Sequence, residues 1–321
     1  MKKIDLLVIY PCHSTAIESV ENIKCFHSMK AYFLNRSFNG LNQDLNIVPL
    51  FWPNYYTKSK NKFRDLQIQC EQQNINIDDV QNILFSSVCM FTFFKYGLGQ
   101  LVEKIPGKII KCEDHEGKPL YSEKLCTIGH FQKQLVPWNF VNGGLIVASD
   151  HFVPLQDWES KILKVHIDHN YLIQPNIFPK IKELLLTIQE KIVNHPDWNS
   201  LEIFYHDRQS SIDELGYFDF SHLSMPALAK IYGSCHIGIM SHRESLGMYP
   251  LEILSSGAIL ITDKNLLVAE LRNEYPFKEI DDINLDLLLD KTMLMNDSLK
   301  NRNHIKKYHF DNYASKILDL L

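Results

Sequence analysis

The chain has 321 residues, of which 45% are hydrophobic and 22% are charged, a balance typical of a soluble globular protein with two compact domains. Its net charge of −5 argues against a polycation that coats nucleic acid or an anionic membrane. The seven cysteines form no C-x-x-C pair, which predicts buried free thiols in a reducing compartment rather than a zinc site. We therefore expect a cytoplasmic protein, either free or peripheral at a membrane.

The first part of the chain alternates strand-like and helix-like segments. Ile4–Tyr10 is an apolar run too short for a secretion signal, and it predicts a buried strand. Helical spacing follows over Ala16–Phe33. The most apolar later stretch, Ile83–Phe94, has about twelve residues, whereas a membrane-spanning helix needs about twenty. The other elements expected here are strands at Leu45–Phe51, Lys108–Cys112 and Gly144–Ala148, a polar helix at Asp65–Gln73 and a mixed apolar block at Val80–Tyr96.

The pattern restarts in the second part of the chain. A strand is predicted at Ile162–Ile167, and the apolar positions of Ile181–Ile192 have helical spacing. We expect an N-terminal domain over residues 1–155, a second domain over 156–303, and an amphipathic terminal helix over 304–321 that can pack back on the first domain. The other elements expected here are strands at Leu201–Tyr205, Ile237–Met240 and Ala258–Thr262, and helices at Pro226–Tyr232 and Pro250–Ser256.

This alternation predicts an α/β protein with two doubly wound, Rossmann-like domains. Strands connected through helices form mostly parallel sheets that are covered on both faces. Such sheets bind ligands at the carboxyl ends of their strands. We therefore expect the functional site in a cleft that the two domains face.

The most informative stretch of the sequence covers residues 231–263. In it a strand leads to a turn at Gly247, a helix expected to begin at Pro250, a terminating Gly257 and another strand. A glycine-containing turn before a helix presents backbone N–H groups and the positive end of the helix dipole. The stretch therefore predicts an anion site suited to a diphosphate.

Two carboxylates bracket this predicted anion site. Glu244 comes just before the turn, and Glu252 lies in the first turn of the expected helix. Carboxylates accept hydrogen bonds from hydroxyl groups, so the arrangement predicts a nucleoside diphosphate sugar, with ribose on one side and hexose on the other. The alternative is that both are solvated carboxylates at a helix end, where Glu252 favours the helix dipole.

The same stretch resembles the donor-site signature of retaining glycosyltransferases with the GT-B fold, a family that includes sucrose synthase and many bacterial lipopolysaccharide and teichoic acid transferases. The resemblance implies that Glu244 contacts the donor sugar and that Glu252 holds the ribose. Backbone N–H groups of Gly247, Met248 and Tyr249 would bind the sugar and the phosphates. The matching residues, in order and spacing, are Ser241, Glu244, Gly247, Glu252, Ser256, Gly257 and the strand Ala258–Ile261.

The resemblance implies transfer of a hexosyl group from a nucleoside diphosphate sugar, such as a UDP-sugar, with retained anomeric configuration. The nucleotide sugar is a co-substrate, and no cofactor or metal is implied, because no Asp-x-Asp cluster follows a strand. The acceptor stays open: a glycan, a lipid-linked glycan, or a modified DNA base as in phage enzymes of this fold. Two alternatives to transfer also stay open, a sugar-nucleotide epimerase and a non-catalytic module that binds sugar nucleotides.

Two histidines near the ends of N-terminal strands are further candidates. His115 follows the strand Lys108–Cys112, where the family often has a histidine near the donor sugar, and we group it with Glu244 as catalytic. His13 follows the first strand, where the family has a glycine-rich loop that this sequence lacks, and it is a candidate on the acceptor or phosphate side. The alternative for each is a turn histidine without a role.

The cation that should face the diphosphate is not obvious from the sequence. The family usually has an arginine and a lysine after the first strand of the second domain, whereas here neither occurs before Lys180. Arg243, beside Glu244, is the preferred donor-site cation, and its alternative is a surface or structural arginine. The other candidates on the phosphate or acceptor side are His169, Lys180 and Arg208.

A basic run extends from Lys58 to Arg64 and is interleaved with aromatic residues. Like charges at this spacing are typical of a solvated loop. The alternative is a contact surface for an anionic acceptor, such as a lipid, a polymer or DNA.

Overall fold

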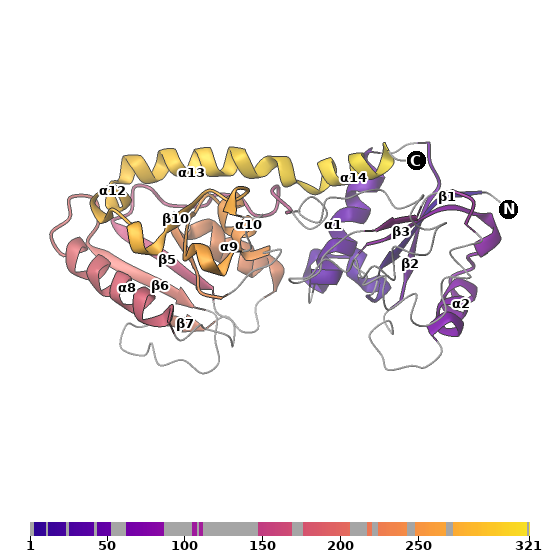
Figure 1. Ribbon diagram of the computed structural model, residues 1–321, viewed down its shortest axis with the longest axis horizontal. Helices are drawn as coiled ribbons and strands as arrows, with labels where there is room; N and C mark the ends of the chain where they lie inside the picture. The colour runs from indigo at the N-terminus through magenta and orange to yellow at the C-terminus, as the bar shows by residue number, and fades with distance from the viewer. Residues whose placement is uncertain are drawn as a thin grey trace. The chain divides into compact units, whose positions relative to one another are not determined.

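The computed structural model of the chain describes residues 3–10, 12–23, 26–41, 44–52, 62–86, 105–107, 109–111, 147–168, 176–205, 217–219, 224–242, 248–267, 272–319 and 321. The chain divides into two compact units (Figure 1). Unit 1 comprises Met1–Gly144 and Phe310–Leu321, and unit 2 comprises Leu145–His309. Each unit has its own parallel sheet, as expected for the α/β class.

The described sheet of unit 1 has the strand order β2-β1-β3-β4, and its neighbouring strands are parallel. The chain starts in the middle of the sheet, adds β2 on one side and then continues on the other side with β3. The order of connection therefore reverses between β1 and β3. The strands are β1 (Ile4–Tyr10), β2 (Ile47–Phe51), β3 (Val80–Phe85) and β4 (Ile109–Lys111).

Three described α-helices belong to unit 1: α1 (Phe26–Leu41), α2 (Lys62–Gln72) and α14 (Phe310–Leu318). The end of the chain returns to this unit, where α14 packs on α1 and the rings of Phe33 and Phe310 lie 5.5 Å apart. Packing against α1 buries the apolar face of α14, which is what its amphipathic sequence predicts.

The predicted helix at Ala16–Phe33 is only partly correct. Its first half forms two 3₁₀ turns, η1 (Ser14–Ile17) and η2 (Val20–Asn22), before α1 begins. The Ser19 hydroxyl accepts the N–H of Glu21 at 3.2 Å, so the side chain competes with helical backbone pairing. A further 3₁₀ turn, η4, precedes β3 at Ile77–Asp79.

The described sheet of unit 2 has the order β10-β9-β8-β5-β6-β7, with parallel neighbours throughout. Its first strand, β5, lies between β6 and β8, so the connections run outward in one direction and then in the other. This is the doubly wound order, with its reversal between β5 and β8. The strands are β5 (Ile162–Asp168), β6 (Ser200–Tyr205), β7 (Tyr217–Asp219), β8 (Ile237–Met240), β9 (Ile259–Thr262) and β10 (Phe277–Glu279).

Helices connect these strands, and α13 extends along unit 2 beside α10 and β9 (Figure 1). Right-handed crossovers in opposite directions place α8 and α10 on opposite faces of the sheet. Among the described residues no helix is both long and apolar enough to cross a bilayer. The helices are α8 (Phe178–Ile192), α9 (Met225–Ser234), α10 (Met248–Ser255), α12 (Leu285–Leu289) and α13 (Lys291–Ile305), with 3₁₀ turns η6 (Lys264–Leu266), η7 (Ile280–Asp282) and η8 (Lys306–Tyr308).

The segment before β5 packs against the rest of unit 2. The boundary between the two units therefore lies after Gly144, earlier in the chain than the predicted boundary at residue 155. Gln156 Nε2 donates to two backbone carbonyls of this unit, at 2.8 Å each, and Ser255 Oγ donates to the carbonyl of Phe152 at 3.0 Å. The strand predicted at Gly144–Ala148 is not formed by its described residues, because Val147 makes only an isolated bridge with His309.

Close packing joins β8, α10 and β9. A Cβ on Gly238 would lie 2.5 Å from Cγ2 of Ile253, so only glycine lets the helix approach the strand this closely. Gly257 has φ 83° and ends α10 in the left-handed conformation, as predicted. The described part of the helix begins at Met248 rather than at Pro250, which places Glu252 two residues further into the helix than predicted.

Acidification is expected to destabilise the protein through His236, which is buried between the rings of Trp158 and Trp198, 4.9 and 5.0 Å away. Its Nδ1 accepts the N–H of Lys164 at 3.0 Å. Burial, with the nearby charges of Lys164 and Lys291, lowers the pKa of His236 to about 4. Because the unfolded chain binds this proton near its ordinary pKa of about 6.5 and the folded protein does not, the free energy of unfolding decreases as the pH falls between these values.

We expect this group to remove about 2–3 kcal/mol between pH 7 and pH 4.5, measured by chemical denaturation. The His236→Asn variant offers an acceptor at the position of Nδ1 without a titrating proton, so its stability should depend less on pH by that amount. Equal pH dependence in the variant and the parent would contradict the assignment.

Candidate functional site

The doubly wound order of unit 2 defines where a ligand should bind. In such sheets the crevice lies at the carboxyl ends of the strands, where the direction of connection reverses. Here that point is between the ends of β5 and β8. We refer to the ends of these two strands, Asp168 with Ser241 and His242, as the switch point.

At the switch point Asp168 contacts two polar residues, Ser241 and His242. Ser241 is buried, and its hydroxyl donates to the backbone carbonyl of Asp168. The carboxylate Oδ2 of Asp168 lies 2.6 Å from Nδ1 of His242, an ion pair when the imidazole is protonated. Ser241 was predicted as a donor-site residue, whereas Asp168 and His242 were not. Their signal in the sequence is a polar residue at the end of one buried strand, β5, and another just past the end of β8.

A buried aromatic cluster supports the switch point from inside unit 2. The Tyr249 hydroxyl, from α10, lies 2.9 Å from Nδ1 of His166 in β5 and donates to the carbonyl of Ile239 at 3.4 Å. Burial, with the charge of Asp168 second, raises the pKa of Tyr249 far above its usual range. Tyr249 therefore stays a neutral hydroxyl that fixes the start of α10 beside β5 and β8. Its predicted role concerned only its backbone N–H, and the side chain is structural.

Glu252 is a buried carboxylate, with an exposed fraction of 6%. The alternative in which it is a solvated carboxylate at a helix end is therefore wrong. Burial, with the charge of Glu252 second, raises the pKa of Tyr232 far above its usual value, so this carboxylate lies near the Tyr232 ring. Met248 at the start of α10 is half-buried, and N–H groups of a first helical turn have no partner within their own helix.

Several predicted site residues lie outside the described residues. They include the predicted carboxylate Glu244, the neighbouring predicted cation Arg243 and the turn residue Gly247. Their proposed roles remain predictions. The other predicted residues in the same position are His115, His169 and Arg208, together with the side chains of the basic run from Lys58 to Arg64.

Lys180 lies near the start of α8, and its ammonium group is held by two carboxylates. Its Nζ is 2.5 Å from Oδ2 of Asp281 and 3.0 Å from Oδ2 of Asp263. Hydrogen bonds to Asp281 and then Asp263 raise the pKa of Lys180. Burial opposes ionisation of Asp263, but the N–H of Asn265 and the Lys180 ammonium lower its pKa. With Glu279 in the same cluster, the negative charges outnumber the lysine.

In unit 1 the equivalent switch point is between β1 and β3. Ser86 follows β3, is buried, and its hydroxyl donates to the carbonyl of Ile9 in β1 at 2.9 Å. This repeats the bond from Ser241 to β5 in unit 2 and was not predicted. His13 is exposed just before η1, and its side chain does not cap that turn. It is therefore accessible, but no described contact assigns it a role.

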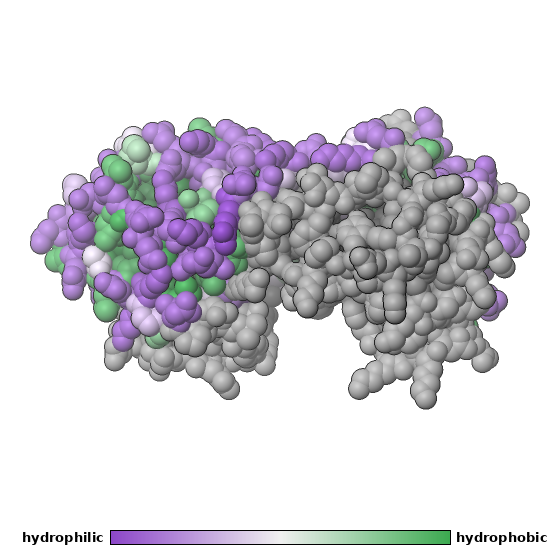
Figure 2. Space-filling model, viewed as in Figure 1, coloured by the Kyte–Doolittle hydropathy of each residue, from purple (hydrophilic) through white to green (hydrophobic). Residues whose placement is uncertain are grey.

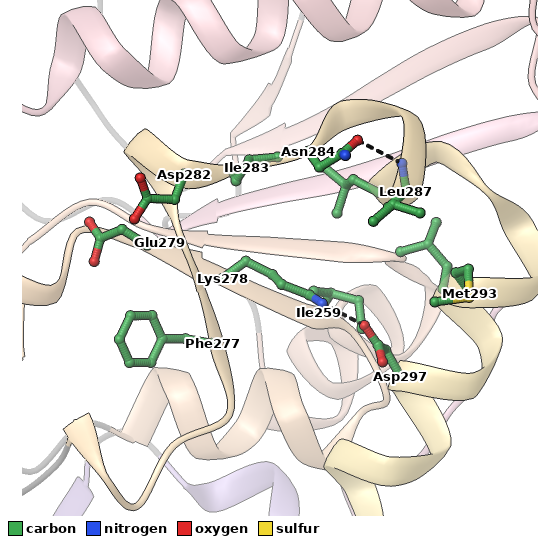
Figure 3. Close-up of a pocket in the computed structure, with 12 residues that line it drawn as sticks. Ile259, Phe277, Lys278, Glu279, Asp282, Ile283, Asn284, Leu287, Met293 and Asp297 are labelled. Atoms are coloured by element: carbon green, nitrogen blue, oxygen red, sulfur yellow. Dashed lines mark hydrogen bonds and ion pairs between the residues drawn. The ribbon is translucent and has the colours of Figure 1, made fainter.

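A pocket of about 300 Å³ lies elsewhere in unit 2, between the edge strand β10 and helices α12 and α13 (Figure 3). Its walls are apolar at Ile259, Phe277 and Leu287, and the Lys278–Asp297 ion pair of 2.7 Å crosses one side. The visible face of the described part of unit 2 is mainly hydrophilic, with apolar patches between (Figure 2). No predicted site residue lines this pocket, so it is separate from the switch point.

The two doubly wound units define the fold class as that of the GT-B glycosyltransferases. A solved O-GlcNAc transferase from Thermobaculum terrenum resembles this chain with a TM-score of 0.52 and 10% identity, over 99% of this chain and 66% of that one. The present chain thus spans just under two thirds of that protein. At this identity the likeness establishes the fold alone.

Other solved structures with weaker likeness are also glycosyltransferases. One from Rickettsia africae has a TM-score of 0.49 and 12% identity, over 99% of this chain and 98% of that one. The C-terminal domain of a group 1 family glycosyltransferase from Francisella tularensis has 17% identity and a TM-score of 0.38, over 50% of this chain and 97% of that domain. No protein-family model matches the sequence, and no curated protein matches it.

Proposed function

We propose that the protein is a retaining glycosyltransferase that moves a hexosyl group from a nucleoside diphosphate sugar to a hydroxyl acceptor. The observation that carries the proposal is the buried carboxylate of Glu252 in the helix that follows the switch point. Each carboxylate oxygen can accept more than one hydrogen bond, so beside its contacts within the protein this carboxylate can also accept hydrogen bonds from ribose hydroxyls. The GT-B fold class supports the same reading.

In the proposed reaction the bond between the anomeric carbon and the diphosphate oxygen breaks, a bond from that carbon to the acceptor oxygen forms, and the acceptor's hydroxyl proton passes to the leaving diphosphate. The diphosphate leaves with increased negative charge, so the main demand is to stabilise it. The first turn of α10, with the N–H groups of Met248 and Tyr249 and the positive end of the helix dipole, is suited to this task. Glu244 is proposed to hold the sugar hydroxyls and Glu252 the ribose.

A direct assay tests the proposal. The purified protein is incubated with UDP-, GDP-, ADP- and CDP-sugars and with glycan, lipid-linked glycan or DNA acceptors. We expect nucleoside diphosphate release that depends on the acceptor, and a product whose anomeric configuration, read by NMR, matches that of the donor. The Glu244→Ala variant should transfer at least about 100-fold more slowly. A variant that transfers as fast as the parent would exclude Glu244 from the site.

One observation favours a second candidate, a module that binds sugar nucleotides without transferring them. Lys180, a predicted phosphate-side cation, is engaged by Asp263 and Asp281. If no other cation stabilised the leaving diphosphate, binding would occur without transfer. The same assay separates the two, because the module binds the donor and releases no nucleoside diphosphate when the acceptor is added.

A further inference from the structure

The sheet of unit 2 ends at β10, whose outer backbone edge has no strand partner among the residues that the structure describes. Unpaired N–H and C=O groups along such an edge can pair with another extended chain. In unit 1 the edge strand β2 is closed by its own chain. Gln73 Nε2 donates to the carbonyl of Phe51 at 3.0 Å, Gln73 Oε1 accepts the Phe51 N–H at 3.2 Å, and Pro49 has no N–H. The edge of β10 instead borders a pocket.

Two neighbouring pockets follow β10. The larger is the pocket of about 300 Å³ shown in Figure 3, and the smaller has about 140 Å³. Pro276, just before β10, lines only the smaller one, and Glu279, at the end of β10, lines only the larger one. Alternate side chains of an extended peptide lie on the same side, so two adjacent pockets along a strand edge suit such a peptide. The residues common to both linings are Ile259, Phe277, Lys278 and Asp297.

The charges around the larger pocket are mainly negative. Lys278 is the cation among the described residues of its lining, and its Nζ lies 2.7 Å from Oδ2 of Asp297. Two further carboxylates line the pocket. Glu279 accepts the backbone N–H of Lys264 at 3.0 Å, and Asp282 is exposed and makes no ion pair with a described residue. A ligand that places a positive charge beside these two carboxylates therefore complements the pocket.

The charged and apolar parts of the larger pocket are separated. Figure 3 shows the carboxylates of Glu279 and Asp282 at one end, whereas Leu287 and Met293 lie toward the other end. We refer to the two pockets between β10, α12 and α13 as the β10 groove. A segment that fits it needs apolar side chains and a cationic side chain at a fixed spacing, which an extended peptide provides.

We propose that the β10 groove binds an extended peptide segment of a protein partner. The backbone of the segment pairs with the outer edge of β10, an apolar side chain fills each pocket, and a lysine or arginine lies beside Glu279 and Asp282. The inference goes beyond the proposed function and does not depend on it, because no residue of the groove belongs to the switch point.

NMR of the methionine methyl groups in the full-length protein tests the proposal. Met293 lines the larger pocket, whereas Met295 is exposed on α13 and lines neither pocket. The probes are two capped peptides of opposite direction, Leu-Thr-Phe-Thr-Lys and Lys-Thr-Phe-Thr-Leu, and their forms with glutamate in place of lysine. We expect one lysine peptide to shift the methyl signal of Met293, assigned with Met293→Leu, but not that of Met295. It should bind about fivefold more tightly than its glutamate form.

Two variants test the charged and the apolar parts of the groove. Asp282→Lys should weaken the lysine peptide about fivefold and strengthen its glutamate form, because the charge at that end is reversed. Asp319→Lys makes the same change at an exposed position of unit 1 and should bind both peptides like the parent. Leu287 is 55% exposed, so Leu287→Ser should leave the fold intact, and it should weaken both peptides about fivefold by removing part of the apolar wall.

Four results would overturn the proposal. The first is a Met293 signal that none of the peptides shifts at millimolar concentration, and the second is equal binding of the lysine and glutamate forms. If hexylamine bound as tightly as the lysine peptide, the pocket would be a site for a small amine instead. If the parent self-associated in sedimentation and Leu287→Ser did not, the occupant would be a second copy of the chain.

Discussion

The Glu252→Gln variant is expected to bind the preferred nucleoside diphosphate sugar about 10- to 100-fold more weakly than the parent. Glutamine keeps the size and shape of the side chain in α10 but removes the charge, and a hydrogen bond to a charged acceptor contributes about 1.5–3 kcal/mol. Because the side chain is buried, solvent screens this interaction little. The dissociation constant is measured by calorimetry for the donor and for the corresponding free nucleoside.

Because Glu252 is proposed to hold the ribose, the measurement with the free nucleoside is decisive. Both ligands contain the ribose, so the affinity for both should weaken. Glu190→Gln removes a carboxylate from the exposed side of α8 and is the matched control. Thermal unfolding of each variant checks that the fold is retained. Unchanged nucleoside affinity in Glu252→Gln would show that Glu252 does not hold the ribose.

The Gly238→Ala variant is expected to lower the free energy of unfolding by about 1–3 kcal/mol, the usual cost of overpacking a core. The added Cβ would lie 2.5 Å from Cγ2 and 3.0 Å from Cδ1 of Ile253, and that side chain is itself fully buried. Either β8 and α10 must separate or Ile253 must leave its preferred rotamer. Chemical denaturation measures the loss.

A double-mutant cycle tests the cause. Ile253→Ala removes the atoms that clash, so the Gly238→Ala/Ile253→Ala protein should be more stable than the sum of the single effects predicts. Gly40→Ala is the control, because a Cβ there meets nothing within 4 Å. Gly40 lies in α1, where alanine has a higher helix propensity than glycine, so this variant should not be less stable than the parent. Additive losses in the cycle would mean that the close contact at Gly238 is not the source of the destabilisation.

The strands and helices that define the fold class were predictable where their buried positions form a regular apolar pattern in the sequence. β8 and the part of β1 from Leu6 to Tyr10 are continuous apolar runs, because both faces of a parallel sheet are covered. In α8 the five buried side chains are the apolar positions that helical spacing predicts. Gly257 ends α10 as predicted, because glycine adopts the left-handed conformation without the cost that a side chain brings.

The prediction missed α13 because its burial pattern contradicts its hydropathy. Its buried face includes Ser298 and Asn301, while Met295 and Leu299 are exposed. The small Ser298 is buried where α13 approaches the end of α10, and a Cβ on Gly257 would lie 2.8 Å from its hydroxyl. Polar side chains suit such a close approach, so hydrophobic periodicity could not identify this helix. The edge strand β10 was missed because three residues, Phe277–Glu279, are too short for an alternating pattern.

By itself the sequence determined the class of fold, the order of its main elements and the segment after β8 that carries Ser241 and Glu252, because these depend on neighbouring residues. Only the tertiary structure decided which charges meet. Asp168 lies against His242, and Lys180 is held by Asp263 and Asp281, through contacts between residues far apart in the chain. Ion pairs of this kind depend on which strand ends lie side by side, and strand order is set by the packing of the whole sheet rather than by local pattern.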